Sequence, residues 1–291
     1  MTDSYREPAP RLPQITLEPH ERPWTKADHL RHRLLLWAPV MPGVFFAALP
    51  FSHPLAAVGL LGVFGVARVI RFAHSYRPAH WFRENERGVA LLRSGNAAGA
   101  LRVLEPVVRE SRRFPGDHSM FLVNLAEALV WSDLRRATAI LEAVDRAGWL
   151  EEAKSPARLV LWAELASCHA LLGHADDAGR WLAKAGTVVF DEGRTRLLLA
   201  WAIGGCRTAR EAEVASELAR RWREGEKAFG AGSPTLRFLG LLRAFALERS
   251  AGSADEVRAL LETARPLPDA HMRTIADHWP ELSEFVWRHE T

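Results

Sequence analysis

Apolar and polar residues follow two different patterns along this chain. From Leu34 to Ala67 no Asp, Glu, Lys or Arg interrupts a run of apolar residues. After Arg71 the apolar residues recur every three or four positions as far as the C-terminus, which is the pattern of amphipathic helices. The sequence therefore predicts an apolar segment followed by a long series of helices, each with one buried face.

The apolar run is too long for one membrane span. As a single helix it would extend about 51 Å, well beyond a hydrocarbon core of roughly 30 Å. Two prolines and a polar pair at 50–54 provide a break, so we expect a helical hairpin with arms Leu34–Leu49 and Leu55–Ile70. Because the arms have no polar face, the hairpin is expected to lie in a membrane. The alternative is a hairpin buried in the core of a soluble protein.

The residues before the hairpin are of another kind. Met1–Trp24 contain five prolines, mixed charges and few large apolar side chains, so they are expected to form a disordered tail. The T-x-x-D sequence of Thr25–Asp28 then predicts a helix start. The expected domains are a disordered tail at 1–24, a membrane helical hairpin at 25–77 and a helical repeat domain at 78–291.

Composition and local signals favour helices throughout. Ala, Leu, Arg and Glu dominate, whereas Ile, Tyr and Thr, which favour strands, are sparse. Glycine and proline clusters recur between the amphipathic stretches. Ser233-Pro234, and Ser253 with Glu256, are typical of helix starts. The sequence predicts an all-α fold in which the helices come in pairs.

Small and large residues recur with a period of about 39 residues. Gly95 and Gly173, which follow the first helix of two units, lie 78 residues apart, and that is two periods. The recurring positions are Gly88, Gly95, Ala100 and Leu104 in the first unit, Phe121, Leu125, Ala128, Ala137, Leu141 and Val144 in the looser second unit, and Trp162, Leu165, Ala166, Gly173, Ala178, Leu182 and Ala185 in the third. Small side chains let two antiparallel helices approach closely, and large ones fill the gaps between them.

In this order of residues the chain resembles the tetratricopeptide repeat (TPR) family from about Ala79 to Phe190, with divergent helix pairs from Thr195 onward. The resemblance implies an α-solenoid whose first helices line a concave groove for a peptide or for a helix of another protein. The units are longer than the usual 34 residues of the family, so a related α-solenoid is the alternative.

The groove implied by the resemblance is mostly apolar. Its polar members Asn85, Arg93 and Glu164 are expected to orient a bound partner. The other implied groove positions are Val89, Leu92, Leu122, Ala126, Val130, Val160, Ala163 and Ser167. The clamp of Lys, Arg and Asn side chains by which the family holds a terminal carboxylate is not matched. The alternative is a groove filled by the chain's own C-terminal helix, Ala270–His289, through Trp279, Leu282, Phe285 and Val286.

No motif for catalysis or for a cofactor is present, because Walker, G-x-G-x-x-G, G-x-S-x-G and H-E-x-x-H sequences are all missing. Cys168, His169 and His174 lie close together, but their spacing matches no pair of metal ligands along a helix. We therefore expect packing there, with no metal site and no enzyme activity. Cys168 and Cys206 are expected to be buried free thiols in a reducing compartment.

Charge bears on partners and on location. The net charge is only +3 and the Arg residues are scattered among acids, which argues against a nucleic-acid partner. Lys26 and Arg33 precede the apolar run and Arg68 and Arg77 close or follow it, while the 50–54 turn has no Lys or Arg. Cytoplasmic flanks collect such residues, so the repeat domain is expected on the cytoplasmic side of the inner membrane.

These features together predict a membrane-tethered scaffold or adaptor of TPR type that binds an unknown protein or peptide. The alternative is a soluble helical accessory subunit of an enzyme or transport complex, with the apolar hairpin buried in its core.

Overall fold

The computed structural model describes residues 15–37, 62–66, 68–69, 79–150, 157–185, 195–230, 232–266 and 269–289. Every regular element in these ranges is a helix, which confirms the all-α prediction. Most of the apolar run Leu34–Ile70 lies outside the described residues. Among the residues that are described, no helix combines the length and the apolar character that a membrane span requires.

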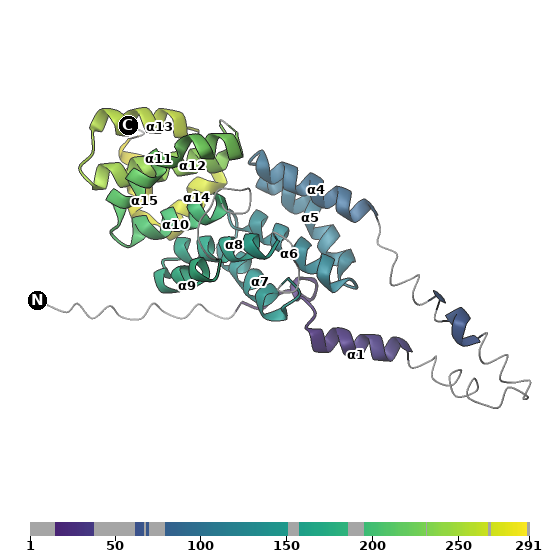
Figure 1. Ribbon diagram of the computed structural model, residues 1–291. Helices are drawn as coiled ribbons and strands as arrows, with labels where there is room; N and C mark the ends of the chain where they lie inside the picture. The colour runs from purple at the N-terminus through teal and green to yellow at the C-terminus, as the bar shows by residue number, and fades with distance from the viewer. Residues whose placement is uncertain are drawn as a thin grey trace, which may run out of the picture.

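After one 3-10 turn, η1 (Pro19–Glu21), the helices are α1 (Lys26–Trp37), α4 (Ala79–Arg93), α5 (Ala97–Ser111), α6 (Pro115–Leu129), α7 (Leu134–Ala147), α8 (Ala157–Leu171), α9 (Ala175–Ala185), α10 (Thr195–Arg207), α11 (Glu211–Phe229), α12 (Pro234–Arg249), α13 (Ala254–Ala264), α14 (Asp269–His278) and α15 (Pro280–Arg288). From α4 to α13 each helix packs against the next one along the chain (Figure 1). Alternate helices also pack together, in the series α4, α6, α8, α10 and α12.

The same turn ends four of these alternate helices. Gly95 and Gly173, which follow α4 and α8, both have φ of +82°, a conformation that glycine adopts without a steric penalty. In each turn the next N–H bonds to the carbonyl five residues earlier, from Asn96 to Leu91 and from His174 to His169. The turns after α10 and α12 repeat this bond, with Ala209 and Ala251 at positive φ. Four of the five first helices in the pairs from α4 to α13 thus end in the same turn, and α6 does not.

Close approach within the first pair depends on Gly88. A Cβ atom at this position would lie 2.6 Å from the side chain of Leu104, so any larger residue would force Leu104 to move at this contact of α4 and α5. Leu104 and Ala100 are fully buried beside it. The small residues that the repeat pattern singles out in this unit therefore lie at a helix contact.

The segment before α1 packs on the helical array. Glu21 is only 1% exposed, and its carboxylate accepts a hydrogen bond of 2.7 Å from Arg136 Nε on α7. The indole of Trp149 donates to the carbonyl of Trp24, and the ring of His29 packs edge-on against Trp149. The sequence predicts a disordered tail at 1–24, yet residues 15–24 are part of the packed body. The partner of Glu21 is 115 residues away, beyond the reach of a local pattern.

Candidate partner-binding surface

Only one of the three polar groove residues faces solvent. Arg93 is exposed at the end of α4, whereas Asn85 is 7% exposed and Glu164 on α8 is 8% exposed. The side-chain carbonyl of Asn85 accepts a hydrogen bond from Asn124 on α6 at 2.8 Å. The structure therefore does not bring the three together as an open polar patch, and their role in binding stays a prediction.

The implied apolar groove positions are covered to different degrees. In the first unit Val89 and Leu92 are half-buried. In the second unit Leu122, Ala126 and Val130 are buried, as are Ala163 and Ser167 in the third. Val160 in the third unit is half-buried. The chain itself therefore covers most of these positions in the second and third units.

Helices from the C-terminal part reach back to the end of α6. The ring of His271 on α14 stacks on Trp131, which follows α6, with ring centres 3.6 Å apart, and Phe238 on α12 packs edge-on against the same indole. The residues that the sequence assigns to self-packing, Trp279, Leu282, Phe285 and Val286, are all buried. The predicted helix Ala270–His289 is two helices, α14 and α15, because Pro280 begins a new one.

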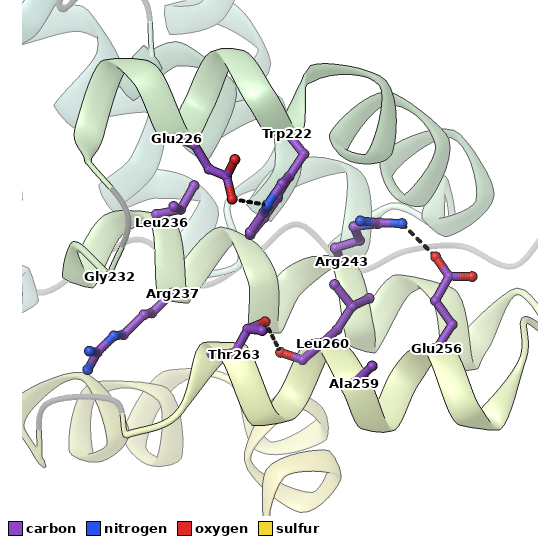
Figure 2. A pocket seen from close by; sticks show the side chains of 11 residues that line it. Trp222, Glu226, Gly232, Leu236, Arg237, Arg243, Glu256, Ala259, Leu260 and Thr263 are labelled. Atoms are coloured by element: carbon purple, nitrogen blue, oxygen red, sulfur yellow. Dashed lines mark hydrogen bonds and ion pairs between the residues drawn. The ribbon is translucent and has the colours of Figure 1, made fainter.

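An open cleft lies instead on helices α11, α12 and α13 (Figure 2). Its volume is about 410 Å³. We call it the α11–α13 cleft, and its lining residues are Trp222, Glu226, Gly232, Leu236, Arg237, Arg243, Glu256, Ala259, Leu260, Thr263 and Ala264.

A glycine and a helix start position the walls of the cleft. A Cβ atom on Gly240, in the middle of α12, would lie 3.2 Å from the ring of Trp222, so the glycine leaves room for that indole against α12. The Ser233 hydroxyl accepts from the N–H of Leu236 at 3.2 Å and begins α12 at Pro234, as the sequence predicts. An interior helix glycine is the one signal by which sequence reasoning could have located this contact.

Polar and charged side chains lie around an apolar floor in the cleft. Leu236, Leu260 and Ala264 are buried. Figure 2 shows two polar contacts. The indole of Trp222 donates a hydrogen bond of 2.9 Å to Glu226 within α11, and Arg243 of α12 forms an ion pair of 2.5 Å with Glu256 of α13. The Nε of Arg243 is buried and makes no hydrogen bond among the described residues. The cleft thus offers an apolar surface, an indole and a guanidinium.

The two cysteines are buried and do not line the cleft. Cys168 and Cys206 are buried free thiols, as predicted. Burial raises the pKa of the Cys206 thiol to about 12 and raises that of Cys168 further. Both thiols therefore stay neutral and act as small apolar side chains.

No protein-family model, no curated protein and no solved structure matches this chain.

Proposed function

We propose that this chain is a membrane-tethered scaffold for protein–protein interaction, built as an α-solenoid of TPR-like helix pairs. The apolar run Leu34–Ile70 supports the tether, and its charged flanks support a cytoplasmic repeat domain at the inner membrane. The recurring turn after α4, α8, α10 and α12 supports the repeat.

The observation that carries this proposal is the open cleft on helices that are otherwise packed together. The groove expected from the family is mostly covered by the chain itself in two units, while the α11–α13 cleft exposes an indole and charged side chains. Trp and Arg contribute much of the binding energy at protein interfaces. The cleft is therefore our preferred place for the partner, and the exposed Arg93 on α4 marks the alternative.

The chemistry of the cleft indicates the kind of segment it binds. An apolar side chain would pack on the apolar floor beside Trp222, and a carbonyl or carboxylate next to it would accept from the guanidinium of Arg243. A short segment with one large apolar anchor next to an acceptor fits both requirements. A nucleic-acid strand does not, because Glu226 and Glu256 lie beside the Arg residues.

The test is capture of partners by the full-length chain in mild detergent. Ala259→Arg fills the cleft from an exposed position on α13, and Ala254→Arg places the same side chain at the exposed start of that helix as a matched control. We expect a protein that wild type and A254R retain and that A259R loses. Equal capture by all three chains would place the partner elsewhere.

A further inference from the structure

Two histidines and an aspartate meet at the turn between α8 and α9. The side chains of His169, His174 and Asp177 each bring one ligand atom within 4.8 Å of the other two. His169 lies in the last turn of α8 and Asp177 in the first turn of α9, so the cluster spans a helix pair.

The turn at Gly173 produces this arrangement. Its positive φ reverses the chain, and the N–H of His174 bonds to the carbonyl of His169 at 2.8 Å. The carbonyl of His174 then accepts from the N–H of Ala178 and begins α9. The spacing H-x-x-x-x-H-x-x-D, which does not fit one face of a single helix, therefore converges across a turn.

The same turn in the first unit carries different residues. Leu91, Asn96 and Gly99 take the places of His169, His174 and Asp177. There the Asn96 side chain accepts from the N–H of Gly99 and caps α5 in the ordinary way. The fold of the turn thus does not require ligand-type side chains at any of the three positions.

His169 is the least expected member of the cluster. It is 4% exposed, and neither ring nitrogen makes a hydrogen bond among the described residues. Its Nδ1 lies 3.9 Å from Asp177 Oδ2, and its Nε2 lies 3.4 Å from Glu142 Oε1 on α7. The contact with His169 lowers the pKa of Glu142, so Nε2 already faces a carboxylate, whereas Nδ1 has no hydrogen-bond partner in the described part of the chain and can take another ligand.

We propose that His169 Nδ1, His174 and Asp177 bind a divalent transition-metal ion of the zinc type, and that Glu142 positions His169. Imidazole and carboxylate are ligands that Zn²⁺ accepts, and a water molecule completes the coordination of a three-residue site. Metal-bound histidines commonly donate their second N–H to a carboxylate, which fixes the ring and its tautomer. Glu142 faces the second nitrogen of His169 in that way.

Asp177 and Glu142 each contact an arginine through one carboxylate oxygen and His169 through the other. Arg180 pairs with Oδ1 of Asp177, and Arg146 lies 3.6 Å from Oε2 of Glu142. Both arginine side chains are mostly exposed, so solvent screens their charge. A third arginine, Arg207, lies close to Gly173. Its guanidinium donates to the carbonyl of His278 and lies over the ring of Trp279.

Binding requires a small closure of the site. Ligand atoms about 2.0–2.1 Å from a tetrahedral ion are roughly 3.3 Å apart, whereas Nδ1 of His169 and Oδ2 of Asp177 are 3.9 Å apart. His174 and Asp177 are only half-buried, so rotation of their side chains can supply this movement. The ion would then join the end of α8 to the start of α9.

The test is calorimetric titration of ZnCl₂ into the full-length chain, purified without a histidine tag and treated with EDTA. We expect one site in wild type, at least tenfold weaker binding in Asp177→Asn and His174→Gln, and wild-type affinity in the matched control Asp176→Asn. Glu142→Gln should weaken binding roughly 10–100-fold with unchanged stoichiometry, as expected of a positioning residue. Zn²⁺ should also raise the unfolding temperature of wild type but not of D177N.

Two results would overturn the proposal. One is a wild-type chain that takes up no Zn²⁺ in the titration. The other is uptake with the same affinity in wild type, D177N and H174Q, because the ion would then be bound by other histidines.

Discussion

The side-chain amide of Asn124 donates a hydrogen bond of 2.8 Å to the side-chain carbonyl of Asn85, which lies 39 residues earlier. The same separation joins Lys184 to Asp145, whose ammonium and carboxylate groups are 2.9 Å apart. The period that the small residues indicate thus reappears as direct contacts between α4 and α6 and between α7 and α9. Polar bonds of this kind fix how one helix pair sits on the next.

Loss of the Asn85 bond should weaken the packing of the first unit. Asn85→Ala is expected to lower the free energy of unfolding by about 1–2 kcal/mol, because the amide of Asn124 loses its acceptor in a largely buried place. Arg87→Ala, an exposed change on the same helix, should stay within about 0.5 kcal/mol of wild type. Denaturant unfolding followed by circular dichroism measures both. An N85A chain as stable as R87A would contradict this role.

The pair of Glu21 and Arg136 should couple the N-terminal segment to the array. Glu21 is buried while Arg136 is partly exposed, so we expect a coupling energy of about 1–2 kcal/mol in a double-mutant cycle of Glu21→Ala and Arg136→Ala. Denaturant unfolding of the four chains gives this value. Additive effects of the two changes would mean that the segment is held by other contacts.

Two buried histidines should make the protein less stable in acid. Burial lowers the pKa of His118 and of His271 from 6.5 to about 4. Between these values the unfolded chain binds protons that the folded chain does not, so stability is full above pH 6.5 and falls as the pH drops toward 4. The loss is about 2 kcal/mol per histidine at pH 5.

His271→Phe tests this effect and keeps an aromatic ring against Trp131. The free energy of unfolding is measured near neutral pH and at about pH 5. The variant should lose about 2 kcal/mol less than wild type between the two. Equal losses in the two chains would show that His271 does not contribute.

Thiol labelling in intact cells tests the proposed topology. Because Cys168 and Cys206 are buried, they should add little background. A cysteine placed at exposed Ser253 should react with a membrane-impermeant reagent only after lysis, and one at Ser52, in the turn that the sequence predicts, should react before it. Labelling of the Ser253→Cys chain in unbroken cells would contradict a cytoplasmic repeat domain.

Features of the fold that depend on neighbours in sequence could be predicted. The three-and-four periodicity predicts helices, Ser233-Pro234 predicts the start of α12, and the spacing of Gly95 and Gly173 predicts two equivalent turns. Each of these depends on local steric and hydrogen-bonding rules.

Features that depend on distant contacts could not be predicted. Glu21 meets Arg136, and His271 meets Trp131, across more than a hundred residues, and neither residue type indicates such a partner. The grouping of His169 with Asp177 escapes prediction for another reason. Rules for ligand spacing apply to one straight helix, whereas the turn at Gly173 folds one helix end onto the next.

The measurement that tests the account most directly is the affinity of the captured partner for four purified full-length chains: wild type, A259R, A254R and Arg93→Ala. Binding in the α11–α13 cleft predicts at least a tenfold loss in A259R, about 1.4 kcal/mol, with A254R and R93A close to wild type. A loss in R93A with full affinity in A259R would contradict it and place the partner on the first unit of the groove.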